Sequence, residues 1–342
     1  MYSLYHNKLK TLLINEFKSI NLCSDSNHHV VNSMIETSLR GIDSHGVNLF
    51  PHYHRAVKSG RINCNPNINI YSRSGSTATI DADRAFGHHS GSKAIEVAQE
   101  LAEKTGIGIV SVFNSTHFGA AGYFALQASR NNYLSFSFTN ADALVKVTNA
   151  KKPYFGTNPI CFTAPMEEEE PFCLDMATSI VSWNKILNAK RNNTPINSNW
   201  AADKDGIECT NPGEAVMLEA IGTYKGFGLG MMVEILCSIL IDGPSGPNIL
   251  PMFSSPIEAR RNISHFFMVI NIDYFTDLLE FKKRLKDIAD EIRRMSNKKT
   301  IYVPGDPEKI QFAKRIKNGI PMDKLKYDEF LLINKDFKSV VY

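Results

Sequence analysis

The sequence lacks closely spaced cysteine pairs. Its six cysteines, at positions 23, 64, 161, 173, 209 and 237, contain no C-x-x-C pair, which is the spacing typical of zinc sites and thiol redox motifs. The first residues also lack the charged and apolar segments of a secretory signal peptide. Both absences favour a protein whose thiols stay reduced, so we expect a cytoplasmic location.

An excess of charge of one sign is also missing. The chain has 38 lysines and arginines against 35 aspartates and glutamates, a formal net charge of +3. The most basic stretch, residues 282–299, also contains Asp287, Asp290 and Glu291, and apolar residues recur through it at helical spacing. We therefore expect a solvated helix there and no nucleic acid partner.

No apolar run reaches the length of a membrane span. The most apolar stretch, Leu229–Ile241, is shorter than the roughly 20 residues that cross a bilayer, and it contains Glu234. The sequence predicts a buried helix here and no association with a membrane.

Three common ligand motifs are absent. The chain has no G-x-G-x-x-G dinucleotide fingerprint, no G-x-x-x-x-G-K-[ST] phosphate loop and no H-E-x-x-H zinc motif. His52 with His54, and His88 with His89, lack an accompanying cysteine or glutamate motif, so we expect no metal. Residues 222–230 form a glycine-rich turn before the apolar stretch, which suits either phosphate binding or close helix packing.

A polar turn containing His117 is the most informative feature that is present. The chain has 342 residues, enough for two domains with a substantial core. A helical pattern over residues 92–104 ends at Gly106, an apolar β-branched run covers 107–113, a helical face covers 120–128, and residues 133–139 alternate as a strand. This pattern predicts a strand, a turn with His117, a helix and a second strand.

The position of His117 favours a neutral imidazole. Unpaired amides and the positive end of the helix dipole disfavour a protonated ring just ahead of a helix, so His117 could act as a base near neutral pH. The small residues from Gly119 to Gly122 let a ligand approach the backbone. A histidine here could also simply cap the turn or pack beneath it.

Two other polar turns follow predicted helices or strands. Helical runs over residues 9–17 and 30–39 precede the segment R-G-I-D-S-H-G at 40–46. The segment D-M-A-T-S at 175–179 ends a strand over 172–176, where it suits a helix N-cap or a ligand contact. Before that strand, we expect the four glutamates at 167–170 to form a solvated hairpin tip.

Six segments together resemble one enzyme family, the malate/L-lactate dehydrogenases of the non-Rossmann type, which include ureidoglycolate dehydrogenase, diketogulonate reductase and sulfolactate dehydrogenase. In family order they are residues 40–46, 114–123, 155–159, 175–179, 224–229 and 303–306. The resemblance implies an α/β homodimer with a non-Rossmann NAD(P)-binding domain on a largely antiparallel or mixed sheet. A second helical or mixed domain would come from the N- and C-terminal parts. We place a substrate and dimerisation domain at residues 1–115 with 290–342, and a dinucleotide-binding domain at 116–289.

The resemblance also assigns site residues. Contacts to NAD or NADP would come from Asp175, Met176, Ala177, Thr178, Ser179, Lys225, Gly226, Pro304, Gly305 and Asp306. His45 and His117 would line the substrate pocket, with His117 as the expected acid and base. We expect Ser44 and His45 to orient the reacting oxygen and Asp142 to tune one imidazole. Tyr53 is a further candidate, although the sequence does not distinguish it from a packing tyrosine.

The chain departs from the family pattern at position 49. Leu49 stands four residues after His45, where the family commonly has an arginine suited to a substrate carboxylate. Arg40, Arg55 or Arg61 could take over that task, or the substrate could lack the usual acid group. Trp183 and Asn184 stand where small or basic residues are common, so the choice between NAD and NADP stays open.

These observations predict an enzyme that moves a hydride between a nicotinamide and a small 2-hydroxy/2-oxo acid or sugar-acid-like substrate. The cofactor would supply the hydride chemistry and the protein the orientation and the proton. Two alternatives stay open: a cyclic imine carboxylate reductase of the same family, and a catalytically silent dinucleotide-binding protein.

Overall fold

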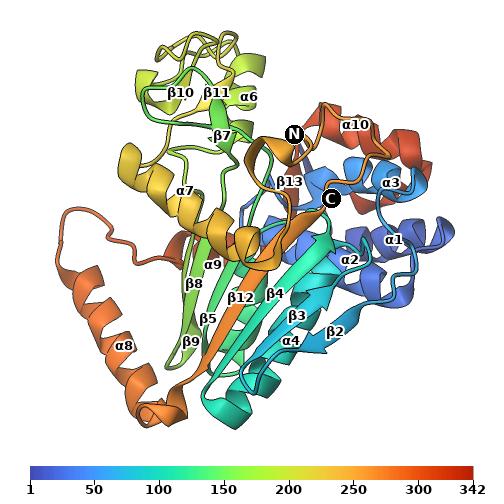
Figure 1. The fold of residues 1–342 in the computed structure, drawn as a ribbon. Coiled ribbons are helices and arrows are strands. Elements are labelled where there is room, and N and C mark those ends of the chain that lie inside the picture. The colour runs from blue at the N-terminus through green and yellow to red at the C-terminus, as the bar shows by residue number, and fades with distance from the viewer. Residues whose placement is uncertain (342) are drawn as a thin grey trace.

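The computed structural model describes residues 1–341 as a mixed α/β protein around one seven-stranded sheet (Figure 1). The strand order is β2-β3-β4-β12-β5-β8-β9. In chain order the strands are β2 (Asn69–Ser72), β3 (Thr77–Asp81), β4 (Ile107–Ser115), β5 (Tyr133–Thr139), β8 (Ile160–Met166), β9 (Glu169–Met176) and β12 (Ile263–Asn271).

The late strand β12 occupies the middle of this sheet. It pairs antiparallel with β4 on one side and with β5 on the other, so β4 and β5 run the same way without touching. Within this seven-stranded sheet, as described over residues 1–341, β3 and β4 pair in parallel and the other neighbouring pairs are antiparallel. The predicted mixed sheet and the strand, turn, helix, strand unit are confirmed, with β12 inserted into that unit.

Helices α4 (Gly87–Thr105) and α5 (Ala121–Arg130) cover one face of the sheet. A Cβ at Gly108 would lie 1.9 Å from the carbonyl oxygen of Ala98, so α4 and β4 approach closely because this residue is glycine. As predicted, Gly106 ends α4 in the left-handed conformation, with φ of 83°. This packing fixes the start of β4. At its other end, a Cβ at Gly87 of α4 would lie 2.4 Å from the Thr116 carbonyl oxygen, so α4 also packs closely on the turn that carries His117.

Helix α7 (Tyr224–Cys237) lies across the opposite face, in front of the sheet in Figure 1. Val233 and Cys237 pack on Phe138 and Phe266 of the sheet, and the buried carboxylate of Glu234 accepts bonds from the Asn158 amide and the Gly246 backbone. The outer side of the helix and the turn after it are exposed by between 38% and 61%, at Leu229, Met231, Met232, Ile235, Ile239 and Leu240.

The expectation of a buried helix is therefore wrong for half of this segment, because apolar residues surround the helix and the sheet covers only one side. By length and composition alone, Tyr224–Ile241 is also long and apolar enough to cross a membrane, a property shared by core helices of soluble proteins. The polar contacts of Glu234 tie the segment to the rest of the protein.

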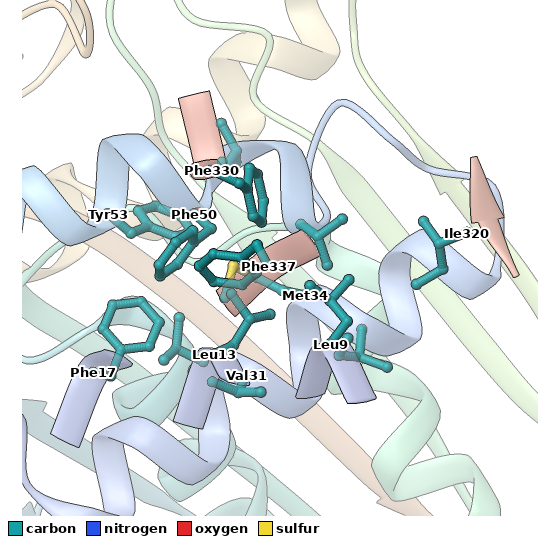
Figure 2. Close-up of a cluster of buried hydrophobic side chains, with 14 of the residues drawn as sticks. Leu9, Leu13, Phe17, Val31, Met34, Phe50, Tyr53, Ile320, Phe330 and Phe337 are labelled. Carbon is teal, nitrogen blue, oxygen red and sulfur yellow. The ribbon is translucent and has the colours of Figure 1, made fainter. Parts of the chain in front are cut away.

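Helices from both ends of the chain enclose a second core beside the sheet. They are α1 (His6–Ser19), α2 (Ser24–Leu39), α3 (Phe50–Lys58), α9 (Asp306–Asn318) and α10 (Lys324–Ile333), joined by the pairing of β1 (Tyr2–Leu4) with β13 (Ile320–Met322). Figure 2 shows Phe50 and Phe337 packed in the middle of this core, with Phe17 and Tyr53 toward one side. A second helical domain from the two chain ends is what the resemblance implied.

A small four-stranded sheet stands above the main sheet in Figure 1, next to helix α6 (Trp183–Arg191). Its order is β10 (Ala201–Ala202), β11 (Met217–Leu218), β6 (Val145–Lys146) and β7 (Pro153–Phe155). The main sheet takes strands from both sides of the boundary placed after residue 115, because β2, β3 and β4 pair into it. The functional division into a substrate domain and a dinucleotide domain stays a prediction.

The acidic hairpin between β8 and β9 is less solvated than expected. Glu169 pairs with Arg293, and Glu170 pairs with both Arg40 and Arg130. The expectation of a purely solvated tip is wrong for these two residues, because β9 already begins at Glu169 and its side chains reach neighbouring helices.

The lysine- and arginine-rich segment forms helix α8 (Leu278–Arg294), which stands apart at one side of the molecule in Figure 1. Only Ala289 in it is buried. The prediction of a solvated helix is confirmed.

Candidate active site

Three separate segments bring polar side chains together around His117. The turn after β4 carries His117, helix α3 carries Tyr53, and the turn after α2 carries His45. The Tyr53 hydroxyl lies 2.7 Å from Nδ1 of His117, and the His45 ring stacks on the His117 ring with centroids 5.6 Å apart. The Ser44 hydroxyl lies 2.8 Å from Nδ1 of His45. The predicted residues Ser44, His45 and His117 therefore form one cluster with Tyr53.

Both imidazoles in this cluster have lowered pKa values. Burial lowers the pKa of His45 to about 4 and lowers the pKa of His117 well below its usual value, with a further contribution from the neighbouring His45. The neutral ring expected at His117 is therefore supported, although the main cause is loss of solvation rather than the helix dipole. Burial also raises the pKa of Tyr53, so its hydroxyl stays protonated.

The hydrogen bonds of the cluster leave one nitrogen of each ring available. His117 uses Nδ1 for Tyr53 and His45 uses Nδ1 for Ser44, while neither Nε2 has a partner among residues 1–341. Both histidines are only partly buried, and the Nε2 atom of each keeps some contact with solvent. A small molecule entering the site can therefore exchange a proton with either ring.

A cleft of about 530 Å³ opens beside His45, a volume within the usual range for cofactor and substrate pockets. It runs from Ser44 and His45 past the backbone of Gly119–Gly122 to the loop at Val303–Gly305. Among the predicted cofactor contacts, the residues that line it are Asp175, Met176, Ala177, Pro304 and Gly305.

Two helices begin at this cleft, which fits the phosphates of a dinucleotide. Helix α5 starts at Ala121 and α9 starts at Asp306, after Gly305 with φ of 99°. A Cβ at Gly305 would lie 3.2 Å from the backbone nitrogen of Cys173, so this position leaves little room for a side chain. Helix N-termini attract anions through free amides and the helix dipole, and the residues present therefore fit a dinucleotide.

The Asp175 side chain binds the N-terminus of helix α5. Its carboxylate accepts the backbone N–H of Gly122 at 2.8 Å. Burial raises the pKa of Asp175 to about 6. The side chain lines the cleft, which is compatible with the suggested ligand contact. The helix that follows in the chain, α6, has Ser182 at its N-cap, so Asp175 contacts the start of an earlier helix instead.

Other predicted cofactor residues have structural contacts outside this cleft. The Thr178 hydroxyl donates to the carbonyl of Thr157, and the Ser179 hydroxyl donates to the carbonyl of Val181, so both stabilise the turn. Asp306 forms an ion pair with Arg293.

Lys225 and Gly226 lie at the start of α7, away from the cleft lining. Lys225 is exposed, and a Cβ at Gly226 would lie 1.7 Å from the Ile221 carbonyl oxygen. Close packing explains this glycine.

The Asp142 carboxylate pairs with an arginine guanidinium group and not with a histidine ring as expected. It forms a buried ion pair with Arg261, a residue that the sequence analysis did not select. Arg261 is 5% exposed and lies two residues before the start of β12. No local motif marks it, because its partner is 119 residues away in the sequence.

The family model described as malate/L-lactate dehydrogenase matches residues 4–330. The chain belongs to this family. Among members of the malate/L-lactate dehydrogenase family, malate dehydrogenase of Pyrococcus abyssi is 39% identical over 313 residues, which cover 88% of this chain and 85% of that protein. L-sulfolactate dehydrogenase of Methanocaldococcus jannaschii is 33% identical over 324 residues, 94% and 93% of the two chains. The crystal structure of malate dehydrogenase from Entamoeba histolytica matches with a TM-score of 0.92 at 28% identity, covering 98% of each chain.

Membership in the malate/L-lactate dehydrogenase family makes this protein an oxidoreductase of CH–OH groups that uses a nicotinamide cofactor. The cleft and the histidine cluster are the parts of the structure suited to that chemistry.

Proposed function

We propose that this protein transfers a hydride between NAD or NADP and a small 2-hydroxy/2-oxo acid or a sugar-acid-like relative, with His117 as the acid and base. The observation that carries the proposal is the cluster of Tyr53, His117, His45 and Ser44, of which Ser44 and His45 line a cleft with two helix N-termini. The bound cofactor supplies or accepts the hydride, and Asp175–Ala177 with Pro304–Gly305 would hold it.

His117 would exchange the proton that accompanies this hydride. In the oxidative direction, the neutral ring accepts the hydroxyl proton at Nε2 while Nδ1 donates to the Tyr53 oxygen. In the reductive direction, the doubly protonated ring gives its Nε2 proton to the forming alkoxide. Tyr53 fixes which ring nitrogen faces the substrate, and Ser44 does the same for His45. Such a positioned acid or base contributes roughly 100- to 10,000-fold in rate.

Replacing His117 with alanine tests this assignment. We expect H117A to lower the rate of the chemical step by about 100- to 10,000-fold and to leave dinucleotide binding, followed by NADH or NADPH fluorescence, nearly unchanged. The matched control is H28A, because His28 is exposed and lies outside the cleft. Wild-type turnover in H117A, with chemistry shown to limit the rate, would contradict the assignment.

Comparing substrates separates the alternatives. Turnover of a cyclic imine carboxylate in place of 2-oxo acids would favour the imine reductase. Dinucleotide binding without turnover of either class would favour a silent binding protein. Measuring NADH and NADPH side by side decides between the two cofactors.

We also propose that the protein is a homodimer and works in the cytoplasm. The outer face of α7 is apolar and exposed, and Leu250 and Phe253 in the segment before β12 are 40% and 63% exposed as well. An apolar surface of this kind marks an interface in a soluble protein, and a second copy of the chain is the partner that covers it. The cysteines are all free thiols, which suits a reducing compartment.

A further inference from the structure

A second, much smaller cavity lies against His117. Its volume is about 20 Å³, enough for one water molecule or one similarly small group. The large cleft is lined by His45 and the small cavity by His117 and Tyr53, so the stacked rings stand between the two. Any group that occupies this cavity lies against His117 and Tyr53.

Two guanidinium groups line this cavity, and the contacts of Arg61 are structural. Its Nη1 donates to the Met252 carbonyl at 3.0 Å, and its Nη2 donates to the Pro256 carbonyl at 2.7 Å and to the Ser255 hydroxyl at 3.3 Å. Arg61 therefore fixes the loop over residues 252–256, and both of its terminal nitrogens are occupied.

Arg261 has a different set of contacts. Its Nε donates to the Leu250 carbonyl at 2.7 Å, and its Nη2 pairs with Asp142. Nη1 makes no hydrogen bond with any residue among 1–341, and it keeps some contact with solvent. The residue is nearly buried and its side chain is held at two points, so one terminal nitrogen is presented in a fixed direction. Its positive charge also contributes to the lowered pKa of His117.

The other two arginines considered as carboxylate anchors lie outside this small cavity. Arg40 pairs with Glu36 and Glu170 and lines the large cleft instead, and Arg55 is exposed on the outside of α3. Leu49 is buried in the core of the N-terminal helices. Arg61 keeps only its Nε without a partner, so Arg261 is the guanidinium beside His117 that retains an unused terminal nitrogen, among residues 1–341.

We propose that Arg261, held by Asp142 and by the Leu250 carbonyl, binds the carboxylate of the substrate in the cavity beside His117 and replaces the arginine missing at position 49. The inference rests on the proposed function and identifies the substrate as a carboxylic acid. A guanidinium donates to a carboxylate through charge-assisted hydrogen bonds, and a dry surrounding strengthens them. The carboxylate would bring the carbonyl next to it toward Nε2 of His117.

The test compares an acid with its neutral ester. We choose the 2-oxo acid that the wild-type enzyme reduces best, together with its methyl ester, and measure kcat and KM for both. In R261Q we expect the KM of the acid to rise about 10- to 100-fold, and the ratio of kcat/KM for acid over ester to fall by a similar factor. Oxamate, used as an unreactive carboxylate probe, should lose affinity by the same factor.

Further variants keep the test independent of folding. R261Q leaves Asp142 buried without its partner, so the double variant R261Q/D142N removes both charges together and should show the same loss of acid preference. R261K keeps the charge and should retain part of that preference. R55Q is the matched control, because it makes the same chemical change at an exposed site and should alter neither KM nor the ratio. Unchanged NADH or NADPH binding shows that each variant is folded.

The outcomes separate this inference from the proposed function. A wild-type enzyme that reduces 2-oxo acids, with an unchanged ratio and unchanged oxamate affinity in both R261Q and R261Q/D142N, contradicts the inference alone. A wild-type enzyme that turns over no carboxylic acid contradicts both.

Discussion

The Tyr53 hydroxyl lies 2.7 Å from Nδ1 of His117, although 64 residues separate the two in the sequence. Tyr53 is 1% exposed and its ring packs edge-on against Phe86 and His88. The hydroxyl is therefore held in place by packing, and it determines which nitrogen of His117 is left for the substrate.

Removing that hydroxyl should slow the reaction without changing the fold. In Y53F the ring stays in the core while His117 loses the partner of Nδ1, so we expect kcat to fall by about 10- to 100-fold with little change in KM. The matched control is Y327F, which removes a buried hydroxyl that donates to the Phe337 carbonyl and lines neither the cleft nor the small cavity. The prediction fails if Y53F and Y327F retain the same kcat.

The two reaction directions should depend on pH in opposite ways. Because the pKa of His117 is well below its usual value, the ring is already neutral at pH 7. Oxidation needs the neutral ring, so kcat/KM for the hydroxy acid should be level from about pH 8 to pH 6. Reduction needs the protonated ring, so kcat/KM for the oxo acid should fall about tenfold for each unit of rising pH. Initial rates in both directions across this range give the answer, and a level profile in both would contradict it.

Asp175 should make the protein less stable as the pH rises. Its pKa of about 6 in the folded protein exceeds the ordinary 3.8, so the folded state holds a proton between about pH 4 and 6 that the unfolded chain has lost. Stability therefore decreases as pH rises through that window, and the full cost is present above it. D175N keeps an acceptor for the Gly122 amide and carries no charge.

We expect D175N to be more stable than wild type by about 1 to 3 kcal/mol at pH 8, with the difference vanishing near pH 4. Urea denaturation at the two pH values measures this. D205N, at an exposed aspartate, should show no such difference. Lower stability of D175N at pH 8 would show that burial of this carboxylate is not costly.

A charge on the outer face of α7 should break the dimer. Ile235 is 46% exposed on the outer face of α7, so I235K places a lysine where the second copy would pack. Light scattering should then report half the molar mass of the wild-type protein. I207K makes the same change at a residue that is 64% exposed in the small-sheet region, and it should leave the mass unchanged. A wild-type monomer would show that another partner covers α7.

The sequence was most informative where the determining contacts are local. Gly106, the strand before His117 and the helix after it follow from periodicity and terminators within about 30 residues, and the structure has each of them. The turns that carry His45 and Asp175 are local in the same way. Their convergence on one cleft was expected only because the chain resembles a known family.

Contacts between distant segments were not accessible to the same reasoning. Nothing in the residues near Tyr53 distinguishes its hydroxyl from that of a packing tyrosine, and nothing near Arg261 indicates its pairing with Asp142. The outer side of α7 is also ambiguous in sequence, since an apolar helix looks the same whether the chain itself or a second copy covers it. These features depend on tertiary or quaternary neighbours.

The central place of β12 has a consequence for biosynthesis. Residues 263–271 supply the strand that joins β4 to β5, so a growing chain carries two incomplete half-sheets with open edges until translation is nearly finished. Such edges invite pairing with other chains, and closing so distant a contact is slow. We therefore expect truncation before residue 263 to yield aggregates rather than a folded fragment, and refolding in vitro to improve at low protein concentration.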